Sequence, residues 1–422
     1  MIKPCSQEAV RGEICYRGFK GVLLQTGMRL KRFRTLMNAT MNADASQNYR
    51  SLENVESRLL LRELLLETSP EKYKMHVERA VHSVAFFTAY GLRIDRLETD
   101  HSEFYAKLEK YSEFPPSVFR ENVLPGQHLV DHRSLQWFRK RADEEGSKEE
   151  LFFKHCLNQT RMVVDKGLSS GASAARALDK QAAYEYSETE VAITSSAPYT
   201  AGVMTTFGTF ETFVLAMLLY PEVMKEAQKT IDTIVGSSRL PGFEDLDSLP
   251  YIRAIIKELG RWHPPAPLGL PHAVTEDDVY EDMFIPAGST VIANVYAITR
   301  NEEFFPNPEE FRPERFVDNP DPFFKNYSVT FGFGRRICPG QHIANDQLFC
   351  LITRLLWAFD VIPRDEGFDP LKYRTPLQPR FGAVPSLPYK LVPRTNSVHS
   401  VVLEEGALAE KEAEAWESFS FR

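Results

Sequence analysis

The residues with the clearest chemical potential lie in one segment, FGFGRRICPG, at residues 331–340. Three glycines surround its single cysteine, Cys338, and the following IANDQLFCLITRLLWAF has helical periodicity. Cys338 is therefore expected in a tight loop at a helix N-terminus, a position that favours the thiolate. The glycines let the backbone bend around the sulfur, and Phe331 and Phe333 are expected to keep water away from it.

Such a thiolate could act as a nucleophile or as a metal ligand. A catalytic nucleophile needs a histidine base, and a zinc site needs further Cys or His residues at short spacing. His342, four residues after Cys338, supports either chemistry only weakly. The remaining interpretation is a buried, unreactive cysteine, against which the glycine, arginine and aromatic surroundings argue.

The segment resembles the cysteine-ligand signature of the cytochrome P-450 superfamily, Phe-x-x-Gly-x-Arg-x-Cys-x-Gly. Phe331, Gly334, Arg336, Cys338 and Gly340 fill every fixed position of that signature. The resemblance implies that Cys338 is the axial thiolate of a haem iron, pushing electron density into the iron to favour O–O cleavage. It also implies that the other four residues help to bind the cofactor.

Two upstream motifs resemble the same family and follow in the expected order. Glu258 and Arg261, in KELGR, match its Glu-x-x-Arg helix, and Arg315, in FRPERF, matches the arginine that completes a buried three-residue network. Alone, Glu258 and Arg261 are an i,i+3 surface pair worth roughly 0.2–0.5 kcal/mol. The resemblance implies a structural role for all three, because a charge buried without its partners is costly.

The resemblance further implies basic side chains that bind the haem carboxylates. Arg336 lies in the signature, and His272, in PLGLPH, stands where the family commonly has Arg or His. Arg34 is a third candidate, since MRLKRFR is similar to the family's Trp-Arg-x-x-Arg helix, with Leu30 in place of tryptophan and Lys31 in place of arginine. A solvated basic helix face is the alternative interpretation of Lys31 and Arg34.

The segment AGVMTT, residues 201–206, resembles the family's oxygen-binding helix segment, Ala/Gly-Gly-x-Asp/Glu-Thr. Thr205 keeps the catalytic alcohol, but Met204 replaces the acid, and a thioether can neither donate nor relay a proton. Glu211 is about 10.5 Å further along a helix, too far to substitute directly. Water-mediated or substrate-assisted protonation, a slow or poorly coupled monooxygenase, and chemistry without oxygen activation stay open. The alternative for Thr205 is a hydroxyl bonded back to its own helix.

The elements that must position these residues are mostly helical, in a globular chain of 422 residues with 43% hydrophobic residues. The net charge of −8 argues against a general nucleic-acid binder. Residues 191–220 are interpreted as a buried core helix, and residues 279–298 predict short strands around a Pro-Ala-Gly turn. We expect a mainly α fold with small β-sheets, of cytochrome P-450 type, with a long central helix over the haem. The five scattered cysteines are interpreted as reduced thiols, Cys5, Cys15, Cys156, Cys338 and Cys350.

Three regions are expected: an N-terminal remnant at 1–28, the haem-thiolate domain at 29–395, and a charged tail at 396–422 that is a solvated helix or disordered. The resemblance begins inside the family's domain, so the first sheet and helices are expected to be incomplete. The family is typically associated with the endoplasmic reticulum membrane. No signal peptide or anchor is apparent here, which predicts a cytoplasmic or peripheral protein.

KELGRWHPPAPLGLPHAVTEDDVYEDMFIPAG and NPEEFRPERF look most like fungal microsomal-type enzymes of secondary metabolism. The resemblance implies a monooxygenase that inserts one oxygen atom from O2 into an apolar substrate. Electrons from NADPH would come through a separate flavoprotein reductase, docked near Cys338 by basic residues around Arg335. The alternatives are a haem-binding pseudoenzyme, impaired by truncation or by Met204, and a hydrolase with Cys338 as nucleophile.

Overall fold

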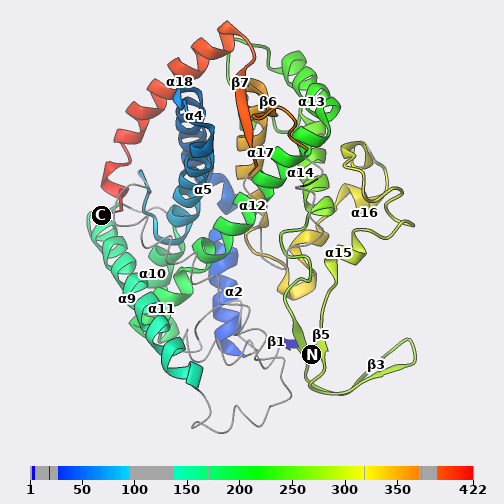
Figure 1. The fold of residues 1–422 in the computed structure, drawn as a ribbon. Coiled ribbons are helices and arrows are strands. Elements are labelled where there is room, and N and C mark those ends of the chain that lie inside the picture. The colour runs from blue at the N-terminus through cyan, green and yellow to red at the C-terminus, as the bar shows by residue number, and fades with distance from the viewer. Residues whose placement is uncertain are drawn as a thin grey trace.

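The computed structural model describes residues 2–4, 19, 27–95, 137–168, 171–317, 319–369, 372 and 387–421, and most of them are helical (Figure 1). The longer helices are α2 (Met28–Met41), α4 (Arg50–Leu66), α5 (Tyr73–Tyr90), α9 (Trp137–Asp165), α10 (Ser173–Tyr184), α11 (Glu188–Ser195), α12 (Ala197–Leu219), α13 (Pro221–Ile234), α14 (Pro250–Trp262), α17 (Gln341–Ala358) and α18 (Asn396–Glu414). Short helices are α3 (Ala43–Ser46), α15 (Val295–Ile298) and α16 (Pro322–Lys325).

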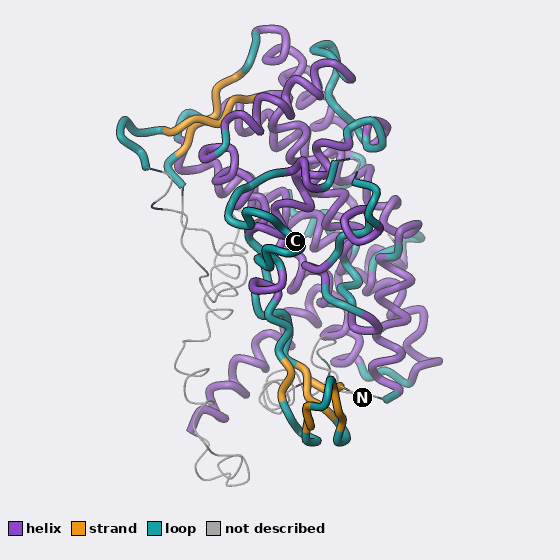
Figure 2. Tube along the Cα trace, turned by 90° about the vertical axis from the view of Figure 1, so that its right-hand side faces the viewer, coloured by secondary structure: helices purple, strands orange, loops and turns teal. Residues whose placement is uncertain are grey.

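In the described part of the chain, three small antiparallel sheets accompany the helices. They are β1–β2–β5 (Ile2–Pro4, His272–Val274, Thr290–Val291), β3–β4 (Asp278–Tyr280, Met283–Ile285) and β6–β7 (Phe359–Pro363, Tyr389–Pro393). The β3–β4 hairpin turns through Glu281 and Asp282, which have φ of 45° and 64° as a type I′ turn requires. The strands lie at two opposite ends of the helical body (Figure 2). The predicted mainly α fold with small sheets is confirmed.

The central helix α12 is buried by the fold, as its composition predicts. Together with α11 it forms a stretch, Glu188–Leu219, long and apolar enough to cross a membrane, but 67% of its most apolar window is buried inside the protein. Phe210 and Phe213 have no exposed surface, and α12 packs along α5 and against α17. Burying one such side chain stabilises the fold by roughly 1.5–3 kcal/mol. Interior packing thus accounts for this hydrophobicity.

Helix boundaries follow local chemistry. Pro221 and Pro250 open α13 and α14, where the missing amide hydrogen has no helical partner to lose. The α5 helix ends at Gly91, whose φ of 68° places it in the left-handed region that glycine adopts without strain. These local signals set the ends of the helices that carry the site.

The C-terminal tail differs from the expected solvated helix or disordered segment. It forms α18, which packs along α4 (Figure 1) and buries Val398 and Val402 against the core. Its acidic face is also engaged, because Arg58 of α4 lies 3.1 Å from Glu405. Phe421 packs edge-to-face on Phe86 at a centroid distance of 4.9 Å. The charge-rich sequence conceals a narrow apolar stripe at helical spacing, which the prediction missed.

Candidate functional site

The cysteine loop, residues 331–340, connects the short 3-10 helix η7 (Val329–Phe331) to α17. Gly332 and Gly334 have φ of 82° and 58°, the left-handed region that side chains with a Cβ rarely adopt. The Cys338 amide donates to the Phe331 carbonyl at 2.8 Å, which closes the loop, and Gly340 caps α17. The backbone therefore bends around the sulfur as the glycine spacing predicts.

The electrostatics of Cys338 differ from the expectation of a favoured thiolate. Burial raises the pKa of its thiol, while a hydrogen bond from the Gly340 amide and the charge of Arg34 act to lower that pKa. The expected polar contributions are present, but in the protein alone burial outweighs them. A metal ion bound to the sulfur would remove the proton, since a coordinated thiol is deprotonated outright. Phe333 is 56% exposed, so it does not shield the sulfur as expected.

Cys350, twelve residues further on, lies in a different environment. It is buried on α17 with its Sγ 3.2 Å from Ser57 Oγ of α4. Burial raises the pKa of its thiol, and α17 packs against α4 at this point. A helical cysteine packed against a neighbouring helix has no open side for a planar cofactor, so Cys338 is the better ligand candidate of the two.

Three predicted cofactor-binding residues lie at the cysteine loop. Arg34 of α2 donates from Nη2 to the Ile337 carbonyl at 2.9 Å. Burial and then the charge of Arg336 lower the pKa of His272, while burial and then the charge of Arg34 lower the pKa of Arg336. Arg336 thus disfavours a positive charge on His272, and Arg34 disfavours one on Arg336. An anion such as a haem carboxylate would relieve that repulsion, so the donor set fits the cofactor that the resemblance implies.

The α2 helix separates the two interpretations of its basic run. Lys31 is exposed, as expected for a solvated face, whereas Arg34 is half-buried at the cysteine loop. Burial lowers the pKa of Arg34, and the Cys338 sulfur acts in the opposite direction. Lys31 therefore lies on a solvated helix face, and of these two residues Arg34 is the one placed to contact a cofactor.

The middle of α12 is accessible between two buried halves. Met204 is 36% exposed, while Tyr199 before it and Phe210 after it are buried. Thr205 Oγ1 donates back to the Ala201 carbonyl at 2.9 Å, which is the alternative that the sequence left open. An accessible stretch in an otherwise buried helix leaves room on that side of the protein for a cofactor or substrate.

The predicted ion network forms in the protein interior. Arg261 binds Glu258 through two hydrogen bonds, Nε to Oε2 and Nη2 to Oε1, both at 2.7 Å, and neither side chain is exposed. Arg315 lies with Nε 3.5 Å from Glu258 Oε1. Burial raises the pKa of Glu258, and the hydrogen bonds and charge of Arg261 act against that rise.

The two arginines also hold a long loop by its backbone. Arg261 donates to the carbonyls of Thr299 and Pro308 at 3.0 and 2.7 Å. Arg315 donates to the carbonyls of Pro306 and Asn307 at 2.5 and 2.7 Å. The three network residues therefore stay together and fix the segment that leads to the cysteine loop, which is a structural arrangement and not one that faces a substrate.

One contact between α14, which carries Glu258 and Arg261, and η7, which leads into the cysteine loop, was not predicted. A Cβ placed on Gly260, between Glu258 and Arg261, would lie 2.7 Å from Thr330 Oγ1 in η7. Only a residue without a side chain allows this approach of α14 to η7. The available signal was a glycine in the middle of an amphipathic helix, where it costs about 1 kcal/mol relative to alanine and so calls for a packing reason.

Comparison with known proteins agrees with this geometry. The family model described as Cytochrome P450 matches residues 10–392. The chain is 34% identical over 411 residues to cytochrome P450 monooxygenase drtD of Aspergillus calidoustus, covering 94% of this chain and 74% of that protein. It is also 34% identical over 364 residues to a cytochrome P450 monooxygenase of Armillaria gallica, covering 83% of this chain and 69% of the relative.

The fold is similar to solved structures as well. A zebra fish cytochrome P450 solved with progesterone superposes with a TM-score of 0.74 at 23% identity, covering 91% of this chain and 87% of that one. A zebra fish cytochrome P450 solved with abiraterone gives a TM-score of 0.73 at 22% identity, covering 93% of this chain and 88% of that one. At this identity the likeness concerns the architecture alone.

Proposed function

Because this chain belongs to the cytochrome P450 family, a family of haem monooxygenases, we propose that Cys338 is the thiolate ligand of its haem and that its substrate is an apolar molecule of fungal secondary metabolism. The enzyme class is supported by the similar proteins, which are fungal cytochrome P450 monooxygenases. The observation that carries the ligand assignment is the glycine-bent loop that presents Cys338 beside Arg34. The bound haem would supply oxygen activation, with the thiolate donating electron density to its iron.

Other residues of the chain bind the haem, shape the cysteine loop and line the substrate space. Arg34, His272 and Arg336 hold the haem carboxylates, and the support for that role is the unfavourable charge of Arg336 at His272 and of Arg34 at Arg336. Phe331, Gly334 and Gly340 shape the loop around the sulfur. The accessible part of α12 lines the space where an apolar substrate binds and water is excluded.

Thr205 is the residue we assign to proton handling. Its Oγ1 proton is directed to the Ala201 carbonyl, so it must turn away from its own helix before it can serve bound oxygen. Met204 has no proton to offer. We therefore expect Thr205→Ala to lower the fraction of reductant consumption that leads to product. Unchanged coupling would make Thr205 a structural residue.

The family generally relies on a redox partner, and we propose a separate NADPH-dependent flavoprotein reductase for this chain. Arg335 is exposed in the cysteine loop, where it could pair with an acidic partner surface. We also propose that the protein works in the cytoplasm or at the membrane periphery.

The testing experiment is the reduced carbon monoxide difference spectrum of the purified protein. We expect a thiolate-type Soret band in the parent protein and in Cys350→Ala, and its loss in Cys338→Ala. Cys350→Ala is the matched control, because it removes a thiol from α17 outside the loop. A thiolate spectrum retained by Cys338→Ala would overturn the ligand assignment.

A second candidate function is supported by Met204 and by the hydrogen bond of Thr205 within its helix. In that case the protein binds haem but turns over poorly. Haem incorporation with little product formation, and gain of activity in Met204→Asp, would favour this candidate. Full coupling in the parent protein would exclude it.

A further inference from the structure

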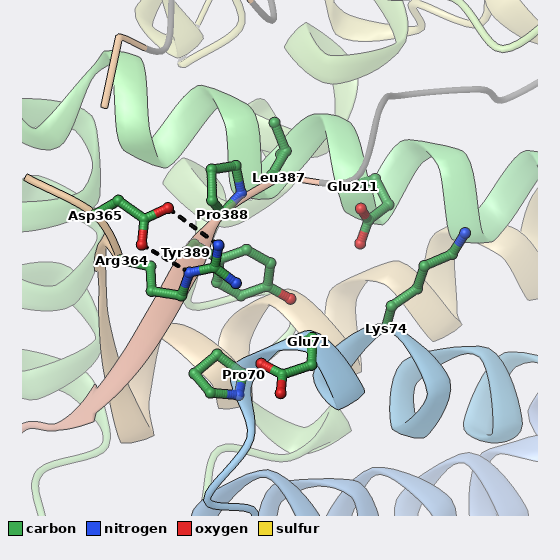
Figure 3. A pocket seen from close by; sticks show the side chains of 9 residues that line it. All are labelled: Pro70, Glu71, Lys74, Glu211, Arg364, Asp365, Leu387, Pro388 and Tyr389. Carbon is green, nitrogen blue, oxygen red and sulfur yellow. Dashed lines mark hydrogen bonds and ion pairs between the residues drawn. The ribbon is translucent and has the colours of Figure 1, made fainter. Parts of the chain in front are cut away.

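A pocket of about 240 Å³ lies between α5, α12 and the β6–β7 sheet (Figure 3). Its wall combines the short 3-10 helix η3 (Pro70–Lys72), the start of α5 and the C-terminal half of α12 with the residues that follow β6 and the start of β7. None of the described residues that line it belongs to the cysteine loop or to the accessible part of α12. The proposed haem site does not account for this pocket.

Glu211 of α12 is the unusual member of the lining. Its side chain is only 3% exposed, and among the described residues its Oε1 has no hydrogen-bond partner. Figure 3 shows the carboxyl group between Tyr389 and Lys74, on the pocket side of the helix. A buried polar atom without a partner costs roughly 1–3 kcal/mol. The orphaned oxygen points to a ligand that donates a hydrogen bond.

The two basic residues of the lining already have partners. Arg364 binds Asp365 through Nε and Nη2, at 2.9 and 3.0 Å from its two carboxylate oxygens (Figure 3). Lys74 lies 3.4 Å from Glu78, with its Nζ 5.5 Å from the ring centre of Phe207. The charge left over in the pocket is therefore negative.

Glu71 and Glu211 supply that negative charge. The structure gives neither of them an ion pair within the described part of the chain. Pro70, Leu387 and the ring of Tyr389 add a smaller apolar part to a lining that is mostly polar. In the same part of the chain, no group of three or more His, Cys, Asp or Glu residues could hold a metal ion. Carboxylates in a polar pocket with a small apolar part suit an organic cation with a short apolar stem better than a bare ion.

We propose that this pocket binds a small organic cation, an amidinium, guanidinium or ammonium group on an apolar stem, whose N–H groups donate to Glu211. Glu71 at the exposed rim would add attraction, and the stem would lie against Pro70, Leu387 and Tyr389. The inference is independent of the haem assignment, because the pocket and the cysteine loop share no lining residue.

The titration of Glu211 makes the proposal sharper. Burial raises its pKa to about 7, with Lys74 lowering that pKa and Glu78 raising it. The other charged or titratable groups around the pocket are Glu71, Arg364, Asp365, Tyr73 and Tyr389. Because the ionised carboxylate is the binding form, affinity for a permanent cation should be nearly full at pH 8, about half of that at pH 7, and lower still below pH 7. From pH 8 to pH 6 the ionised fraction changes about tenfold.

The experiment is calorimetric titration of benzamidine into the holoprotein at pH 8, with the haem spectrum recorded in parallel. Benzamide, the neutral analogue, is the ligand control. We expect saturable binding of benzamidine with an unchanged Soret band, binding about tenfold weaker at pH 6, and no binding of benzamide. Binding that shifts the Soret band would place benzamidine in the haem pocket and overturn the proposal.

Two variants locate the binding. Glu211→Gln keeps the shape of the side chain and should weaken benzamidine at least tenfold, whereas Glu71→Gln at the rim should weaken it a few-fold. Glu222→Gln, on the exposed first turn of α13, is the matched control and should bind like the parent protein. Affinity unchanged by both Glu211→Gln and Glu71→Gln, or no saturable binding by the parent protein at pH 8, would overturn the proposal.

Discussion

Within the described part of the chain, two buried ion networks reach the same kind of arrangement by different routes. In the α14 network, Glu258 and Arg261 sit one helical turn apart and Arg315 joins them from the following loop. In the α4–α5 network, Glu56 of α4 receives Arg79 of α5 at 2.6 Å and Arg93 at 2.7 Å. Both carboxyl groups are nearly inaccessible to solvent.

The carboxyl groups of these networks respond oppositely to their surroundings. Burial alone would raise both pKa values. Arg79, Arg93 and a hydrogen bond from Ser83 overcome burial and lower the pKa of Glu56, whereas the pKa of Glu258 stays raised. Glu56 has two guanidinium groups at hydrogen-bond distance, while Glu258 has one, with Arg315 further off at 3.5 Å. The second close guanidinium group of Glu56 therefore explains why charge pairing outweighs burial there, whereas burial outweighs charge pairing at Glu258.

The largest expected effect comes from breaking the α14 network. Arg261→Ala leaves Glu258 buried without its close partner and removes three hydrogen bonds to backbone carbonyls. We expect a loss of roughly 3–5 kcal/mol in the free energy of unfolding, a large part of the total for most proteins, and therefore little haem-loaded protein. The readout is the yield of protein with a thiolate-type carbon monoxide spectrum.

Arg253→Ala is the control for this prediction. Arg253 lies on the same helix, but its side chain is 45% exposed. Its ion pair with the exposed Asp247 is long, at 3.7 Å, and solvent weakens it, so the loss of Arg253 should change stability little. A normal yield of Arg261→Ala would show that the network is not needed for folding.

The second prediction concerns the α4–α5 network. Glu56→Gln leaves two buried cations with a weaker partner, although Arg79 keeps Glu63 at 3.3 Å, and we expect a loss of about 3 kcal/mol at pH 7. Because the folded-state pKa of Glu56 is lowered, its contribution is present above the unfolded pKa of about 4.5 and disappears as the pH falls through the folded value. Urea midpoints at pH 7 and pH 4 measure this. An equal difference between variant and parent at both values would contradict the lowered pKa.

The third prediction tests the link from the α14 network to the cysteine loop. Gly260→Ala forces a Cβ against Thr330 Oγ1, an overpacking that costs about 1–3 kcal/mol or displaces η7. We expect part of the carbon monoxide complex to lose its thiolate-type band. Thr330→Ala removes the clashing oxygen, so the double variant should recover the band. Failure of this rescue would mean that Gly260 acts through something other than Thr330.

The smallest expected effect is at the exposed margin of the α4–α5 network. Hydrogen bonds to Glu63 and Glu67 raise the pKa of His76 against the opposing influence of burial. This contribution to stability is full below the unfolded pKa of about 6.5 and is lost as the pH rises through the folded value. His76→Gln should therefore lower the urea midpoint slightly at pH 6 and not at pH 9, while the exposed His399→Gln changes it at neither pH. A larger effect at pH 9 would contradict the raised pKa.

The contrast between the networks also explains what could be predicted. Glu258 and Arg261 are separated by one helical turn, so their pairing is local and their spacing identified it. Glu56, Arg79 and Arg93 are distributed over two helices and the segment that follows, and each has the appearance of an ordinary surface charge in the sequence. Only the packing of α4 against α5 brings them together. The acidic α18 was misjudged for the same reason, since its apolar stripe has meaning only against α4.

The sequence by itself determined the helical architecture, the family, the glycine-bent loop and the position of its cysteine, because these depend on residues that are neighbours along the chain. The tertiary structure decided what depends on distant segments. It placed Arg34 and His272 beside the cysteine loop, and it made burial outweigh the Gly340 hydrogen bond and the Arg34 charge in setting the pKa of Cys338. It also enclosed Glu211 in a pocket of its own. The reason is physical, since desolvation and charge pairing act through space and a linear pattern records only spacing.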